Sequence, residues 1–156
     1  MYAGGDATLI PFTPIEEDRY IALATNSRRQ GVVAAKNMVG KDMTIPRVSG
    51  TSGLQLFDYK FGQTGVHGSE TDSYDGHLGQ KHVEELIQPK FMQDETTIHM
   101  KIIYDEDSHK ILGGQVMSIE DVTASINTIS VAISAGFTLE QLAVQDFFFQ
   151  PDYDRP

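Results

Sequence analysis

Cysteine is absent from this chain of 156 residues. Its absence excludes disulfide bonds, thiolate metal sites and a cysteine nucleophile within the chain, so any thiol chemistry has to come from elsewhere. Long apolar runs are also missing, because no stretch reaches the roughly 20 residues that cross a bilayer. The N-terminus lacks the basic, apolar and small-residue order of a signal peptide. We therefore expect a cytoplasmic protein without a membrane partner.

Positive charge is scarce, with 12 Lys and Arg against 22 Asp and Glu, for a formal net charge of -10. The Lys/Arg clusters do not extend beyond the pair Arg28-Arg29. A negative mean field repels the phosphates of nucleic acids and anionic lipids. Nucleic acid is therefore not expected as a partner.

Common catalytic and metal-binding motifs are missing as well. No HxH or HExxH spacing that would hold a metal occurs, and neither does a GxSxG nucleophile elbow. The nearest look-alike, VSGTSGL, precedes a predicted strand rather than a helix, so we interpret Gly50 and Gly53 as a bulge or a tight bend. We expect the five histidines to be scattered surface or structural residues: His67, His77, His82, His99 and His109.

What the chain does contain is the composition of one packed domain, with 40% hydrophobic and 22% charged residues and enough length to bury a core without covalent staples. Residues 24–39 have side chains near helical spacing, with Thr25 or Asn26 as a candidate N-cap and Gly40 as a stop. Gly31, inside this helix, costs about 1 kcal/mol relative to alanine, which indicates close packing against another backbone. Residues 13–19, rich in acids, are typical of a surface connection.

The middle of the chain carries strand signals. In GLQLFDYKF, Phe57, Tyr59 and Phe61 recur at every second position and would form an aromatic face on one strand. The stretch HGSETDSYDGHLGQ is typical of a loop. HVEELIQPKFM and TTIHMKIIYD are predicted strands, and DEDSHK is a turn that leads into ILGGQVMS and so forms a hairpin.

The last third changes to a helical period. SIED at 118–121 and TLEQ at 138–141 match the capping box, Gly136 ends the first of the two helices, and the second is expected to end near Gln145. Together the elements predict an α+β fold in which an antiparallel sheet of about four to five strands has helices packed on one face. The apolar stripe of the first helix consists of Ile119, Val122, Ile126, Ile129 and Ile133.

Two stretches are candidates for function. The opening Gly-Gly-Asp-Ala places small residues and the carboxylate of Asp6 in a turn where a backbone can pass close to a polar ligand, although an ordinary turn has the same pattern. Near the C-terminus, DFFFQP contains three consecutive phenylalanines, which cannot all face one core. A subunit interface and a buried strand with one partly exposed ring both remain open for this tail.

In combination, these pieces resemble the C-terminal part of the pyridine nucleotide-disulfide oxidoreductases, and most closely their bacterial NADH oxidase branch. The resemblance covers almost the whole chain in the family's order. It implies the dimerisation-domain fold of the FAD/NAD-linked reductases and a homodimer. The matching segments are YAGGDAT at 2–8, ALATN at 22–26 with RQG at 29–31, GTSG at 50–53 with FDYK at 57–60, and DFFFQP at 146–151.

The resemblance also implies a cofactor site. Gly5 and Asp6 would form the turn whose carboxylate hydrogen-bonds the ribityl and pyrophosphate region of FAD, while Ala22, Leu23 and Ala24 would bring backbone groups at a helix start to the flavin pyrimidine ring. The positive end of the helix dipole would stabilise negative charge on the reduced flavin. The parent enzyme would pass electrons from NADH through FAD to dioxygen.

Other parts of the family's machinery are missing from this sequence. Family members carry two GxGxxG fingerprints, for FAD and for NADH, and a single redox cysteine, and the chain has neither feature. We therefore expect residues 1–45 to be the end of a FAD-binding domain and residues 46–156 to be a C-terminal dimerisation domain that lacks the family's final helix. By itself the chain should be inactive and should bind no cofactor tightly.

The residues of the C-terminal tail indicate to which branch of the family the chain is most similar. Gln150-Pro151 stands where dithiol relatives present His-Pro, and glutamine cannot shuttle a proton, which favours the single-cysteine branches. The phenol of Tyr153 would face the cysteine of the partner subunit, and it is the single catalytic candidate in the chain. Two alternatives stay open: a coenzyme A-disulfide reductase or NADH peroxidase parent, and a self-contained interaction module without redox chemistry.

Overall fold

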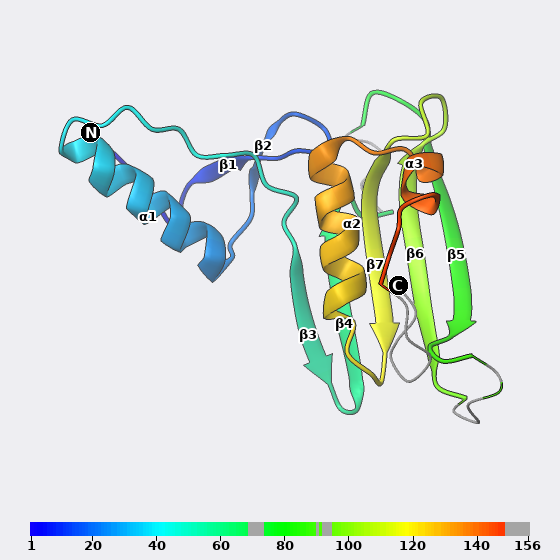
Figure 1. The fold of residues 1–156 in the computed structure, drawn as a ribbon. Coiled ribbons are helices and arrows are strands. Elements are labelled where there is room, and N and C mark those ends of the chain that lie inside the picture. The colour runs from blue at the N-terminus through cyan, green and yellow to red at the C-terminus, as the bar shows by residue number, and fades with distance from the viewer. Residues whose placement is uncertain (69–73, 90, 92–94, 149–156) are drawn as a thin grey trace.

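The computed structural model describes all residues except 69–73, 90, 92–94 and 149–156 (Figure 1). Five antiparallel strands form one sheet in the order β3-β4-β7-β6-β5, and two short strands form a second sheet. The predicted α+β class and antiparallel sheet are confirmed. The elements are β1 (Leu9–Pro11), β2 (Asp18–Tyr20), α1 (Ala24–Met38), β3 (Ser52–Leu56), β4 (Tyr59–Gly65), β5 (Leu78–Leu86), β6 (Thr97–Asp105), β7 (Ile111–Ser118), α2 (Thr123–Ala135) and α3 (Leu139–Ala143).

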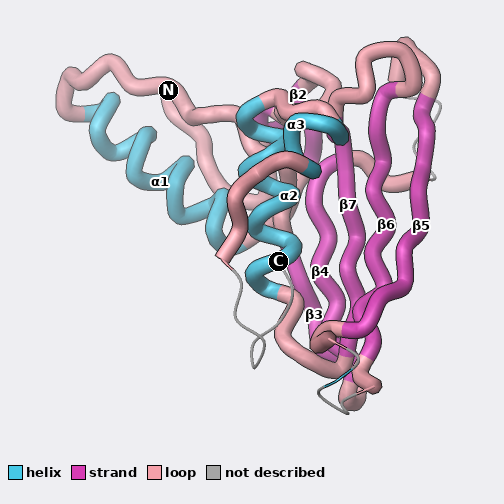
Figure 2. The backbone as a smooth tube through the Cα atoms, turned by 45° about the vertical axis from the view of Figure 1, so that its right-hand side comes forward, coloured by secondary structure: helices cyan, strands magenta, loops and turns pink. Residues whose placement is uncertain are grey.

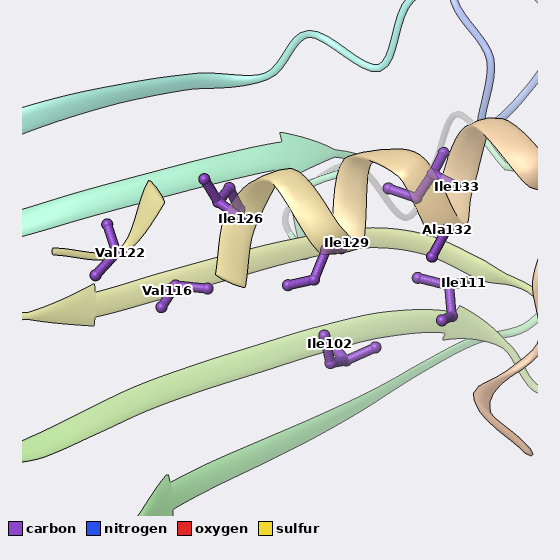
Figure 3. Close-up of a cluster of buried hydrophobic side chains, with 8 residues drawn as sticks. All are labelled: Ile102, Ile111, Val116, Val122, Ile126, Ile129, Ala132 and Ile133. Carbon is purple, nitrogen blue, oxygen red and sulfur yellow. The ribbon is translucent and has the colours of Figure 1, made fainter. Parts of the chain in front are cut away.

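Helix α2 covers one face of the large sheet (Figure 2). The predicted apolar stripe packs on the sheet from Val122 onward, but Ile119 precedes the helix and is 43% exposed, so its inclusion in the stripe was wrong. Glycines on β4 and β7 remove the side chains that would hold the helix away: a Cβ on Gly62 would lie 3.0 Å from the Cβ of Ile126, and one on Gly114 would lie 2.9 Å from the Cγ2 of Ile129. Ile129 is 2% exposed. The helix can therefore pack its isoleucines directly on the backbone of the sheet. Figure 3 shows the resulting core of Ile102, Ile111, Val116, Val122, Ile126, Ile129, Ala132 and Ile133.

Helix α1 and the β1-β2 hairpin lie beside the large sheet rather than on it (Figure 1). They join it through a second apolar cluster in which Phe12 packs with Val66 and Leu112. A backbone bridge between Phe12 and Val48 adds to this contact. No helix among the described residues is long and apolar enough to cross a membrane.

Several sequence expectations are wrong in detail. The stretch GLQLFDYKF is two strands, because the chain reverses at Phe57, which has φ +54, and Leu54 pairs with Phe61. Phe57 is therefore an 86% exposed turn residue and not part of an aromatic strand face. Residues 13–19 are not simply a surface connection, since β2 pairs antiparallel with β1. Gly31 has no other atom within 4 Å of an added Cβ among the described residues, so it does not pack against a second backbone.

The helix ends are partly as expected. Gly136 ends α2 in the left-handed conformation, and Thr138 caps α3 in a complete capping box, although α3 ends at Ala143 instead of Gln145. The box at 118–121 does not form. Ser118 is the last residue of β7, and its hydroxyl donates to the carbonyl of Thr97 on β6 at 2.8 Å and accepts from the N–H of Glu120 at 3.2 Å instead of from that of Asp121. Helix α2 therefore begins after Val122 without a side-chain cap.

Candidate functional site

The glycine turn at the start of the chain is held against helix α1. Gly5 has φ +108, a conformation that side chains rarely adopt. Its N–H donates to the Oε1 of Gln30 at 2.6 Å, and Thr8 donates to the same atom at 3.0 Å. Gln30 is 9% exposed. A buried amide from the middle of α1 therefore fixes the path of the turn, a role that the sequence pattern alone did not indicate.

Asp6 lies next to the first turn of α1. The hydroxyl of Ser27 donates to its Oδ1 at 2.5 Å. In the described part of the chain, no hydrogen bond is found to its second oxygen, and Asp6 is exposed. One carboxylate oxygen therefore positions the side chain, and the other can accept a hydroxyl from a ligand.

The start of α1 presents backbone donors. Leu23 is the N-cap residue in an extended conformation, and no side chain caps the helix. The N–H groups of Asn26 and Ser27 donate to the carbonyl of Leu23, whereas those of Ala24 and Thr25 have no acceptor among the described residues. Unpaired N–H groups at a helix start carry a partial positive charge and attract an acceptor atom. The structure thus brings the predicted turn and the predicted helix start together at one end of α1.

A polar hollow of about 220 Å³ adjoins this helix start. Ala22 and Leu23 line it together with Gln63 from β4 and His67 from the residues after this strand. The sequence analysis did not assign Gln63 and His67 to the site, because no motif connects the end of a strand with a helix start about 40 residues earlier in the chain. Gly65, with φ +72, turns the chain there.

Four hydroxyls form a network beside the hollow. Ser49 and Thr51 lie on the segment before β3, Thr64 lies on β4, and Ser130 lies on α2. The shortest contact, from Thr51 to Ser130, is 2.7 Å, and Thr64 donates to Ser49 at 3.0 Å. These hydroxyls bond one another instead of a base, so VSGTSGL connects the segment after α1 to the sheet and to α2. Gly50, with φ +68, forms the expected bend, whereas the same expectation is wrong for Gly53, which pairs regularly with Gly62 inside β3.

Other candidate residues do not join this site. Tyr153, like Gln150 and Pro151, lies outside the described residues, and the tail is described only as far as Phe148, which is 73% exposed. Within the described ranges, no group of three or more His, Asp and Glu side chains could hold a metal. A second, larger hollow of about 620 Å³ lies on the face of the sheet opposite α2. Its lining is mostly apolar, and it lacks the helix start and the carboxylate.

Two perturbed groups are not among the residues that line the hollow: Asp105 at the end of β6 and Tyr74 before β5. Hydrogen bonds from Ser108, and then from Tyr74, lower the pKa of Asp105 to about 2. Burial, followed by the hydrogen bond to Asp105, raises the pKa of Tyr74 to about 12. Asp105 accepts from the N–H of Ser108 at 2.7 Å and from Tyr74 at 2.8 Å. This cluster closes a turn and takes no part in the candidate site.

Residues 52–155 match a protein family, the pyridine nucleotide-disulphide oxidoreductase dimerisation domain. The NADH oxidase of Enterococcus faecalis is 39% identical over the whole chain, which spans 35% of that protein. The NADH oxidase of Streptococcus pyogenes is 33% identical, again over the whole chain and 34% of that protein. The chain therefore spans about a third of the length of these curated relatives.

Solved structures give the same result. The water-forming NADH oxidase of Lactobacillus brevis, bound to NADH, superposes with a TM-score of 0.92 at 37% identity, over 99% of this chain and 34% of that one. The reduced CoADR-RHD protein of Bacillus anthracis superposes with a TM-score of 0.88 at 27% identity, over 97% of this chain and 28% of that one.

Proposed function

The chain belongs to the pyridine nucleotide-disulphide oxidoreductase family through its dimerisation domain, and we propose that it is the C-terminal part of a flavoprotein NADH oxidase. In this proposal, residues 1–45 complete the FAD-binding domain and residues 46–156 form the dimerisation domain. The observation that carries it is the joint placement of Asp6 and the start of α1, because the segment that supplies both lies outside the residues matched by the domain model. An interaction module would not require a carboxylate and unpaired helix N–H groups in this position.

The residues at this end of α1 fit FAD by the chemistry of their donors and acceptors. The free oxygen of Asp6 suits a hydroxyl of the ribityl chain, and the N–H groups of Ala24 and Thr25 suit the acceptor atoms of the flavin pyrimidine ring. Gly5 leaves open space where a Cβ would otherwise stand. When bound, FAD accepts a hydride from NADH and passes the electrons to an acceptor.

The chain's own contribution would be binding and electrostatics. The helix start would stabilise negative charge that accumulates on the flavin ring, and Gln30 would keep the turn of Gly5 and Asp6 in place through its two hydrogen bonds. The polar wall with Gln63 and His67 would close the hollow from the dimerisation domain. Dioxygen as the acceptor is supported by the curated relatives named NADH oxidase. A coenzyme A-disulfide reductase or NADH peroxidase parent is the second candidate, and the relative from Bacillus anthracis favours the former.

A chimera tests the flavin proposal. Our chain would replace the matching region of the Lactobacillus brevis NADH oxidase, and flavin content and NADH oxidation would be measured on the purified protein. We expect a yellow, active enzyme that loses most of its FAD in the D6A variant. D18N, which alters an exposed aspartate on β2, serves as a charge control and should retain FAD. Full flavin content in D6A would contradict the assigned role of Asp6.

Self-association follows from membership of a dimerisation-domain family and is tested on the 156-residue chain itself. Light scattering over a concentration series should show a mass that rises from monomer to dimer. The exposed ring of Phe148 supports a contact through the C-terminal tail, and in the chimera Y153F should lower turnover without loss of FAD. A cytoplasmic location stays a prediction from the sequence.

A further inference from the structure

The larger hollow, on the face of the sheet opposite α2, has the size of a small-molecule site. Its volume is about 620 Å³, and such sites usually measure about 300–1,000 Å³. Ile102 and Val116 lie in the core under α2, and successive side chains of a strand point to opposite faces. Lys101, Gln115 and Met117 therefore point into the hollow, which they help to line.

One part of the hollow has an apolar floor. Leu54 of β3 pairs with Phe61 of β4, and Phe61 pairs with Met117 of β7, so the three side chains form one row across three strands. Leu56, two positions further along β3, also lines the hollow. Leu54 is 61% exposed and Leu56 is 54% exposed. Exposed leucines gathered beside an aromatic ring in a hollow favour an apolar occupant.

A polar row runs beside this floor. Gln63 pairs with Gln115, Gln115 with Lys101, and Lys101 with His82 of β5. The amide, ammonium and imidazole groups of such a row can all donate hydrogen bonds to an anionic oxygen. One end of the hollow is therefore rich in donors, and the other end is apolar.

The positive charge in this row is not neutralised within the described part of the chain. Lys101 forms no ion pair with another described residue, and its Nζ lies at the rim, 2.9 Å from where a Cβ on Gly68 would stand. Glu84, the nearest carboxylate along the apolar row, already lies 3.5 Å from His99. The ammonium group of Lys101 is thus available to an anion from solution.

The distance between the two ends indicates an elongated ligand. Neighbouring strands are about 4.7–4.9 Å apart, so β6, which carries Lys101, lies about 14 Å across the sheet from β3, which carries Leu54. A molecule whose apolar body covers Leu54 and Phe61 can therefore place a terminal anionic group at Lys101. A small inorganic anion would contact the polar row alone, and the net charge of -10 would repel it.

We propose that this hollow binds an elongated apolar molecule with a terminal carboxylate, such as a medium-chain fatty acid. The site goes beyond the proposed function, because its ligand is neither flavin nor nicotinamide. It meets the hollow beside α1 only at Ser52 and Gln63, whose side chains are hydrogen-bonded at 3.2 Å. An open hollow buries only part of a small ligand, so we expect a dissociation constant between about 10 µM and 1 mM.

The carboxylate is tested with decanoate and with decanol, which has the same chain length and no charge. Calorimetry on the 156-residue chain should show that K101Q weakens decanoate binding about fivefold, the upper end for an exposed ion pair, and leaves decanol binding unchanged. K81Q is the matched control. Lys81 pairs with Ile102, whose side chain lies under α2, so Lys81 is on the other face of the sheet. Equal effects of K101Q and K81Q on decanoate binding would refute the assignment of the carboxylate.

The apolar floor is tested by L54D, which should weaken the binding of both ligands more than about tenfold because it places a charge in the apolar part of the hollow. V131D makes the same change at a 66% exposed position on α2 and should have no effect. Circular dichroism checks that both variants are folded. Equal losses in L54D and V131D, or no decanoate binding at millimolar concentration, refute the site. If decanoate does not bind and L54D converts a dimer to a monomer in light scattering, the face is covered by a second copy instead.

Discussion

Replacement of Gly62 by alanine should destabilise the protein, because α2 rests on the backbone of β4 at this point. The new Cβ would lie 3.0 Å from the Cβ of Ile126 and 3.1 Å from its Cγ1 and Cγ2. Ile126 cannot rotate away, since a β-branched side chain on a helix has one strongly preferred rotamer. Overpacking of this kind costs about 1–3 kcal/mol, and the smaller entropy of the unfolded alanine chain returns about 0.4–1 kcal/mol.

The expected net loss is about 1–2 kcal/mol, which corresponds to a melting temperature lower by about 2–8 °C in a domain of this size. Circular dichroism during thermal and urea unfolding measures it. G31A is the matched control, because an alanine there meets no other atom within 4 Å and should stabilise α1 by about 0.5–1 kcal/mol. In the double variant G62A/I126A the loss of unfolding free energy should be about 1 kcal/mol smaller than the sum of the losses in the two single variants, because the smaller side chain at 126 makes room for the new Cβ. A melting temperature of G62A at or above that of the wild type would refute this account of how α2 packs.

Three further predictions concern polar contacts. Q30L should cost about 1–3 kcal/mol, because it leaves the N–H of Gly5 without its acceptor, and urea unfolding would measure the loss. T138A removes the cap of α3 and should cost about 0.5–2 kcal/mol by the same assay. The pKa of Asp105 is lowered from 3.8 to about 2 in the folded protein, so its contribution to the unfolding free energy should be complete above pH 3.8 and be lost as the pH falls towards 2. The pKa of Tyr74 is raised from 10.0 to about 12, so its contribution should be complete below pH 10 and be lost as the pH rises towards 12. A stability curve of D105N that still falls over the acid range like the wild type would contradict the first part.

The sequence predicted the elements whose signals are local. Helix α1 begins and ends within one residue of the expected 24–39, because side-chain spacing and a glycine stop act within a few turns. The capping box at Thr138 formed because both of its partners lie three residues apart. The same local pattern at Ser118 failed, since this residue is the end of β7 and its hydroxyl accepts from the N–H of Glu120 rather than from that of Asp121. Its place in the sheet beside Thr97 of β6 cannot be read from the surrounding sequence.

The candidate site was predicted in its parts but not in its assembly. Asp6 and the start of α1 were named through the family resemblance, whereas the hydrogen bond from Ser27 to Asp6 spans 21 positions. Gln63 and His67 line the hollow because the pairing of β4 within the sheet brings the end of this strand next to the start of α1. No spacing rule connects these positions to Ala22.

By itself, the amino-acid sequence determined the helices, the strand-forming stretches, the absence of thiol chemistry within the chain and the family to which the chain belongs. Tertiary structure decided where Phe57 reverses the chain, which glycines lie under α2, and which residues line the hollow together. The physical reason is that apolar and polar residues can alternate through a two-residue turn in the same way as along one straight strand, so the pattern in the sequence is the same for both. The pairing of Leu54 with Phe61, a contact between strands, separates the two cases.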